Sequence, residues 1–131
     1  DRKTGKEFFY FDTHFDHIGK QARAESARMM VARMKRIAGE KAAVFLSGDL
    51  NTTYDNALLD PLKAWMQSAR HAAPVTDELP TFNDFGKRSL WIDFIFARNA
   101  RALAYRTLVD SGRYGVPFLS DHNPVYALYK L

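Results

Sequence analysis

Residues 42–51 read AAVFLSGDLN, an apolar run that ends at a glycine and is followed by polar side chains. A short apolar run bounded by a turn residue is typical of a central, buried strand. Gly48 allows a tight turn at its end, and Asp49 and Asn51 follow at a spacing of two. Side chains at that spacing point the same way on an extended backbone. The stretch therefore predicts a buried strand that presents a carboxylate and an amide together at its end.

The segments around this strand predict a mixed α/β fold. Four further runs are rich in aromatic and aliphatic residues, and we expect them to be strands: residues 7–13, 90–97, 103–109 and 125–131. Strands and helices alternate loosely at first, and strands dominate later. That order indicates a mixed sheet with helices on one face.

Two segments have the periodicity of helices. Residues 21–38 place apolar side chains near one helical face. This expected core face consists of Ala27, Met30, Val31, Met34, Ile37 and Ala38. Residues 56–70 form the second candidate, with Pro61 best placed in the first turn. Residues 71–88 are expected to form a long polar loop.

Composition limits the class of protein. The chain has 131 residues, of which 47% are apolar and 14% aromatic, which suits one globular domain with a buried core. Its net charge of +4 suits an anionic substrate but is too small to establish nucleic-acid binding. The absence of cysteine excludes disulfides, zinc–thiolate sites and a cysteine nucleophile. No run approaches the ~18 apolar residues of a membrane-spanning helix, and no targeting segment is visible.

Three further motifs place polar groups at or just beyond strand-like runs. They are Asp12-Thr13-His14, Trp91-Ile92-Asp93-Phe94 and Ser120-Asp121-His122. Together with Asp49 and Asn51 they supply carboxylates, imidazoles and an amide, the groups needed for metal-assisted attack of water on a phosphate ester. Taken singly, each motif has a simpler interpretation as an Asx turn, a surface turn or a solvated edge strand. Only folding could bring all four to one site.

The four motifs in this order resemble those of the endonuclease/exonuclease/phosphatase family, which includes DNase I, abasic-site endonucleases, sphingomyelinases and inositol polyphosphate phosphatases. The resemblance runs from about Phe8 to the C-terminus. It implies a DNase I-like four-layer α/β/β/α sandwich, of which residues 1–131 would supply the C-terminal sheet and its outer helices. One departure is Asp12, where the family usually has Asn.

The resemblance also implies a role for each candidate residue. Asp49 would position and activate the attacking water, with help from Asn51. His14 and His122 would stabilise the phosphoryl oxygens. Asp93 would accept a hydrogen bond from His122 and fix its ring.

Metal binding is expected to need more than this chain. The resemblance assigns Asp121 to a Mg²⁺ or Mn²⁺ site, and a carboxylate is a natural ligand for such an ion. The complete family site also has an Asn and a Glu ligand from an N-terminal half, and no residue here stands in the right context to replace that Glu. The expected partner is therefore the N-terminal half of the same fold.

The resulting hypothesis is a metal-dependent phosphoesterase that hydrolyses a phosphodiester of the nucleic-acid, nucleotide or phospholipid type by direct water attack. The alternatives are a phosphomonoesterase acting on an inositol- or sugar-phosphate-like substrate, and an inactive fragment that needs the N-terminal half. A basic nucleic-acid-binding module without catalysis is a weaker alternative. Residues 11–17, FDTHFDH, resemble a bacterial subgroup related to deadenylase-type phosphodiesterases.

Three further side chains have two interpretations each. Asp16 and His17 either act in the site or shape the loop after His14. Phe82 either packs beside the substrate or within its own loop.

Overall fold

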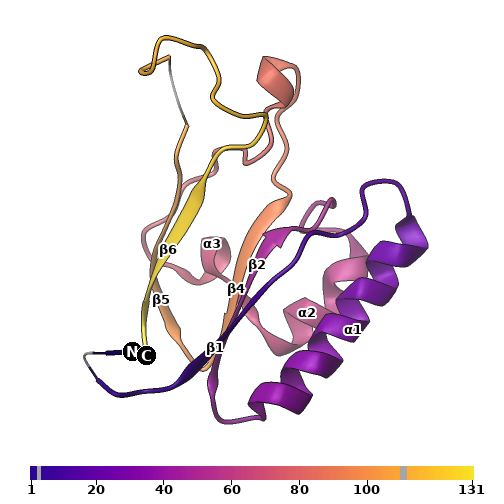
Figure 1. Cartoon of the computed structure of the whole chain (residues 1–131), viewed down its shortest axis with the longest axis vertical. Helices are drawn as coiled ribbons and strands as arrows, with labels where there is room; N and C mark the ends of the chain where they lie inside the picture. The colour runs from indigo at the N-terminus through magenta and orange to yellow at the C-terminus, as the bar shows by residue number, and fades with distance from the viewer. Residues whose placement is uncertain (3, 110–111) are drawn as a thin grey trace.

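A four-stranded sheet forms the centre of the computed structural model, which describes residues 1–2, 4–109 and 112–131 (Figure 1). Its strand order is β1-β2-β4-β3. β1 (Phe8–Asp12) lies parallel to β2 (Ala43–Asp49), and both strands are confirmed where the sequence predicts them. A parallel pair needs a crossover connection, and a long helix supplies it here.

The C-terminal strands complete the architecture. β4 (Asp93–Arg98) pairs antiparallel with β2, and the two-residue β3 (Gln67–Ser68) pairs with the other edge of β4. β5 (Arg101–Thr107) and β6 (Val125–Lys130) pair with each other as an antiparallel ribbon. The mixed α/β class is therefore confirmed, although the strands form two sheets, of four and two strands, where one was expected.

Helix α1 (Lys20–Ala38) covers one face of the central sheet (Figure 1). The predicted core face is confirmed at five positions, which are buried or pack against the core: Ala27, Met30, Val31, Met34 and Ala38. Ile37 is a correction, because its side chain is 51% exposed. The stripe that ends at Ala38 already faces the sheet, so Ile37 falls beside it.

The predicted helix over residues 56–70 is wrong as a continuous element. A 3-10 turn, η1 (Ala57–Leu59), leads into α2 (Asp60–Trp65), and a separate short helix, α3 (Ala69–Ala72), follows. Pro61 lies in the first turn of α2, as predicted.

The interruption has a tertiary cause. Met66 leaves the helix with an extended backbone, φ −128° and ψ 162°. Gln67 and Ser68 then pair with the open edge of β4, where Ser68 is buried. Tertiary pairing outweighs the local helical preference of this segment, which sequence periodicity alone does not register.

Side chains alternate across the central sheet. Val44 and Leu46 of β2 join the core beneath α1 and α2, together with Phe94 and Phe96 of β4. Phe45 points to the opposite face, as expected from a period of two.

This opposite face is apolar and open. Phe45 packs edge-on against Phe8 and Tyr129, with ring centroids 5.7 and 5.0 Å apart. These rings line a groove of about 980 Å³ beside the β5–β6 ribbon, and neighbouring Tyr10 is 61% exposed. An uncovered apolar sheet face is what one half of a sandwich presents when nothing packs against it.

Three strand ends meet at one edge of the central sheet. β1 and β2 are parallel, so their carboxyl ends lie together, and β4 runs the other way, so its first residue arrives at the same edge. Asp49 at the end of β2 is paired in register with Asp93 at the start of β4. His14 follows two residues after β1. The topology therefore brings three of the four sequence motifs together.

Gly48 allows β1 and β2 to come together at this edge. Its φ is +142°, and a Cβ atom there would lie 1.7 Å from the carbonyl oxygen of Thr13. The chain beyond β1 continues along β2, because the Phe15 amide donates to the Asp49 carbonyl at 2.9 Å. A side chain at position 48 would force these segments apart.

We expect Gly48→Ala to destabilise the fold by at least about 3 kcal/mol, because backbone strain and a backbone clash act together. Denaturant unfolding measures the loss. Gly39→Ala is the matched control, since Gly39 also has a positive φ of 68° but no atom within 4 Å of an added Cβ. The control should lose about 1–3 kcal/mol from backbone strain alone, because φ 68° and ψ −167° lie in a region that is essentially glycine-only, so Gly48→Ala should lose more. Equal losses in the two variants would contradict the clash.

Candidate active site

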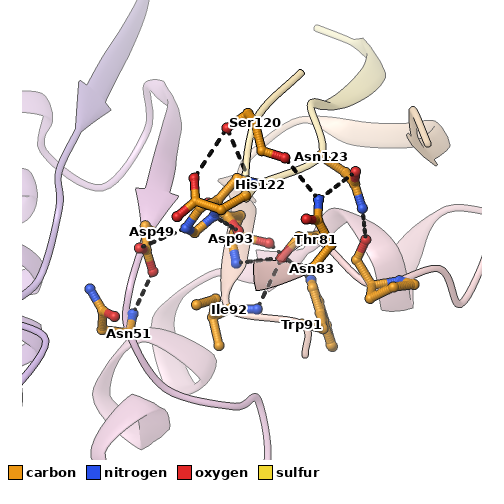
Figure 2. A network of polar contacts seen from close by, with 12 residues as sticks. Asp49, Asn51, Thr81, Asn83, Trp91, Ile92, Asp93, Ser120, His122 and Asn123 are labelled. Carbon is orange, nitrogen blue, oxygen red and sulfur yellow. Dashed lines mark hydrogen bonds and ion pairs between the residues drawn. The ribbon is translucent and has the colours of Figure 1, made fainter. Parts of the chain in front are cut away.

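The predicted residues converge on one cleft of about 610 Å³. Its lining includes His14, Asp49, Asn51, Asp121 and His122. The sixth predicted residue, Asp93, is hydrogen-bonded to His122 from the start of β4 (Figure 2). The structure thus brings all six side chains to one edge of the sheet.

Two carboxylates flank the His122 imidazole. Its Nδ1 lies 2.8 Å from Asp93 Oδ2, and its Nε2 lies 3.8 Å from Asp49 Oδ2. An ionised carboxylate only accepts hydrogen bonds, so Nδ1 carries a hydrogen and donates it to Asp93. The ring is thereby held with Nε2 toward Asp49.

Asp49 has an unusual environment for a carboxylate. Only 13% of its side chain is exposed, and burial raises its pKa above the usual 3.8, with the nearby charge of Asp93 adding to the effect. Two influences oppose that shift. The backbone N–H of Asn51 donates a hydrogen bond to Asp49 Oδ1 at 2.8 Å, and the two histidines lie close by. Burial prevails, so Asp49 takes up a proton more readily than an ordinary aspartate.

Asn51 fixes the loop that carries His14. Its backbone is left-handed, with φ 49°, and its amide Nδ2 donates to the Phe15 carbonyl at 2.8 Å. The same Nδ2 lies 3.0 Å from His14 Nε2, which is also 3.2 Å from Asp49 Oδ2. One ring nitrogen cannot accept and donate at once. His14 therefore either accepts from Asn51 or donates to Asp49, according to its protonation.

Asp49, Asp93 and His122 form a group that could hold a metal ion. One ligand atom from each lies within 4.8 Å of the others. Carboxylate oxygens are the donors that Mg²⁺ prefers, and this ion usually keeps several waters and needs only one or two carboxylates. The donor set therefore fits Mg²⁺ or Mn²⁺, with His122 already engaged by Asp93.

Asp121 lies apart from that group. It lines the cleft, and its Oδ1 accepts a hydrogen bond from Ser120 Oγ at 3.3 Å. Its assignment as a metal ligand stays a prediction, and the compact trio is a second arrangement that the sequence did not indicate.

Thr81 is a supporting residue whose contacts the sequence did not reveal. It is fully buried, and its Oγ1 accepts from the backbone amides of Ile92 and Asp93 at 3.1 and 3.0 Å (Figure 2). These bonds fix the start of β4, which carries the partner of His122. The available signal was a small polar residue between Pro80 and an aromatic residue, and such a residue is common in loops.

Asn83 and Asn123 form a second buried support. Asn83 Nδ2 donates to Asn123 Oδ1 at 3.0 Å and to the Ser120 carbonyl at 3.2 Å, and Asn123 Nδ2 donates to the Pro80 carbonyl at 2.9 Å. The pair ties the loop of Thr81 to the loop of His122. Buried amides need partners, and here Asn83 donates to Asn123 while both side chains also donate to loop carbonyls.

The side chains with two interpretations are now placed. Phe82 packs on the His122 ring, with centroids 4.8 Å apart, and also lines the cleft. His17 lines the cleft. Asp16 accepts from the amides of Ile18 and Gly19 at 2.7 and 2.5 Å, which lowers its pKa and shapes the entry to α1. Its contacts are those of a loop residue.

Asp12 also makes a local contact. Its Oδ1 accepts from Ser47 Oγ at 2.8 Å. The carboxylate at this position thus satisfies a hydroxyl group of the neighbouring strand.

Comparisons with known proteins show which solved structures resemble this chain. No protein-family model and no curated protein sequence matches the chain. Among solved structures, an endonuclease/exonuclease/phosphatase from Bacteroides vulgatus is 32% identical with a TM-score of 0.84, over 100% of this chain and 52% of that one. A mannosyl-6-phosphatase from Bacteroides thetaiotaomicron is 31% identical with a TM-score of 0.84, over 99% of this chain and 54% of that one.

A more distant likeness concerns the fold alone. TDP2 from D. rerio, solved with a single-strand DNA product, is 17% identical with a TM-score of 0.67, over 92% of this chain and 55% of that one. The chain thus spans about half the length of the solved structures it matches.

Fold and neighbours together define part of a DNase I-like α/β fold. The chain belongs to the endonuclease/exonuclease/phosphatase family and forms part of its DNase I-like fold. Within the described residues, no helix is both long and apolar enough to cross a membrane.

Asp49→Asn should leave the fold intact and make it more stable at pH 7. A folded pKa above the unfolded value means that stability is fully present below the unfolded pKa, near 3.8, and is lost as pH rises through the folded pKa. The side-chain amide of the asparagine variant does not ionise, so the variant does not lose stability in this way as pH rises. Thermal melts of both proteins at pH 3.5 and pH 7 measure the effect, and the gain should appear mainly at pH 7. A lower melting temperature for the variant at pH 7 would refute the assignment.

Thr81→Val should destabilise the fold by about 2 kcal/mol or more, because two buried amides lose their acceptor while the side-chain volume is kept. Thr81→Ser keeps the oxygen and is the control, with a smaller loss expected from the missing methyl group. Urea unfolding distinguishes them. Indistinguishable stabilities for the valine and serine variants would show that the hydroxyl is unimportant.

Proposed function

We propose that this chain carries catalytic residues of a metal-dependent phosphoesterase that breaks a phosphate ester by direct attack of water. The observation that supports it best is the convergence, at one cleft, of a mostly buried carboxylate, Asp49, with His122 and its hydrogen-bond partner Asp93. Membership of a hydrolase-containing family supports the same class of reaction.

Asp49 acts as the base that positions the attacking water. Its raised pKa brings it closer to the operating pH than an ordinary aspartate, which favours proton transfer. The backbone N–H of Asn51 donates to Asp49 Oδ1. The other carboxylate oxygen, Oδ2, therefore faces the two histidines.

His122 and His14 donate to the phosphoryl oxygens as negative charge develops there. The Asp93 carboxylate stabilises the protonated ring of His122 and fixes its orientation. His14, whose side chain is 72% exposed, lies 3.2 Å from the same oxygen of Asp49 that His122 faces. The two rings thus form a pair of donors around the carboxylate.

A divalent cation, Mg²⁺ or Mn²⁺, would supply charge neutralisation of the phosphate when bound. Asp121 would offer an oxygen donor for it in this chain, which leaves Asp49 and His122 available for the roles given above. The trio of Asp49, Asp93 and His122 would instead offer two carboxylates and a ring nitrogen, in place of those roles. The remaining half of the sandwich supplies further ligands and covers the open apolar face lined by Phe8 and Phe45.

Two substrate classes are supported by different observations. The sequence motifs favour a phosphodiester, as in nucleases and phospholipid-cleaving relatives. Similarity to a mannosyl-6-phosphatase, at 31% identity, favours a sugar phosphomonoester. The ratio of diesterase to monoesterase activity separates the two.

Asp49→Asn and His122→Ala should each lower kcat/KM for a phosphate ester by about 10²–10⁴. The assay follows Mg²⁺- or Mn²⁺-dependent hydrolysis of bis(p-nitrophenyl) phosphate and p-nitrophenyl phosphate. Asp60→Asn is the control, because it makes the same chemical change at a carboxylate 63% exposed and outside the cleft. Undiminished turnover in the Asp49 variant would refute its role. Turnover that does not respond to chelation would refute metal dependence.

A further inference from the structure

One wall of the cleft is a short β-hairpin that joins Phe82 to Leu90. The Phe82 amide donates to the Leu90 carbonyl at 2.9 Å, and the Leu90 amide donates back to Phe82 at 3.1 Å. Both side chains line the cleft, and they give this wall an apolar surface next to His122. The proposed mechanism gives this wall no role.

The hairpin has a defined tip. Asp84, Phe85 and Gly86, which form the 3-10 turn η2 (Asp84–Gly86), all have positive φ, at 47°, 52° and 85°. The turn closes so that the Arg88 amide donates to the Asn83 carbonyl at 3.0 Å. The return leg, which carries Arg88, therefore has a fixed register against the outgoing leg.

The hairpin is also bonded to the loop of His122. The Asn83 amide donates to the Asp121 carbonyl at 2.7 Å, and the Asn123 amide donates to the Thr81 carbonyl at 2.6 Å. The Asn83–Asn123 side-chain pair adds a third link. Arg88 is consequently held at a set position relative to His122.

Arg88 is the only permanently positive side chain among the described residues that line the cleft. Its Nε lies 3.5 Å from Asp84 Oδ2, and the side chain is 64% exposed. A guanidinium group has five donors, and this one contact orients the side chain while leaving its terminal NH₂ groups available to a ligand. Planar, paired donors of this kind suit a phosphate group.

We propose that Arg88 binds a second phosphate group of the substrate, beyond the one that is cleaved. The inference rests on the proposed function, since it takes the cleft as the phosphate-ester site. The scissile phosphate lies at Asp49 and His122, the sugar or base of the substrate lies against Phe82 and Leu90, and the second phosphate reaches Arg88. The substrate class is therefore a bisphosphorylated compound, either a nucleotide with a neighbouring phosphate or a sugar bisphosphate.

Binding tests this proposal without relying on turnover. Dissociation constants are measured by calorimetry in the full chain, in the Asp49→Asn background. The nucleotide probes are thymidine 3′,5′-bisphosphate and thymidine 5′-phosphate, and the sugar probes are glucose 1,6-bisphosphate and glucose 6-phosphate. Arg88→Ala is compared with Lys87→Ala, which removes the same charge from the next residue, outside the cleft lining.

Arg88→Ala should weaken binding of one bisphosphate by about tenfold or more, as expected for loss of a charge-assisted hydrogen bond. Its monophosphate partner and the Lys87→Ala protein should change less than about twofold, because a long-range charge effect is screened by salt. Arg88→Lys should recover part of the affinity. The pair that responds, nucleotide or sugar, identifies the scaffold.

Equal weakening by Arg88→Ala and Lys87→Ala, or equal weakening of mono- and bisphosphate, would overturn the role of Arg88 while leaving the proposed function in place. A parent protein that binds none of the four probes would overturn both. Loss of stability does not confuse these outcomes, because Arg88 is mainly exposed and thermal melts report folding separately.

Discussion

The close approach of two backbones at Gly48 is the constraint on which the site depends. The Thr13 carbonyl occupies the space that a side chain at position 48 would need. Only because nothing larger than hydrogen is present can the chain beyond β1 follow β2 past its end. That path sets His14 beside Asp49, and the antiparallel neighbour β4 sets Asp93 on the other side. The placement of His14 beside Asp49 thus follows from one missing Cβ atom.

Burial of charged groups at the site lowers the stability of the fold, and packing elsewhere must offset that cost. Two carboxylates, Asp49 and Asp93, lie mostly buried on either side of one imidazole, and each would be more stable in water. A domain accepts such a cost when the rest of its core is well packed. Here the rings of Phe94 and Phe96 and the side chains beneath α1 supply that packing directly behind the cleft. The stability that the core face provides therefore offsets the cost of the polar groups at the edge of the sheet.

The sequence predicted the convergence of the motifs better than it predicted the elements between them. The polar residues at strand ends were recognisable because four short motifs follow one another in the order that the endonuclease/exonuclease/phosphatase family shows, each at or just beyond a strand-like run. The break at Met66 was not, since it depends on an open edge of β4 that lies about thirty residues away in sequence. The prediction that Ile37 belongs to the core face was wrong because the apolar face of a helix has a limited width, and Ile37 lies outside it.

The amide pair of Asn83 and Asn123 has a consequence for substitutions near the site. It joins the wall of the cleft formed by Phe82 and Leu90 to the loop that carries His122, so a shift of one segment would strain the bonds to the other. Replacements that reshape this wall from within would disturb the imidazole as well. Changes to exposed side chains such as Arg88 and Phe85 would leave these bonds in place, whereas replacing Thr81 or either asparagine would break a buried hydrogen bond that supports the site.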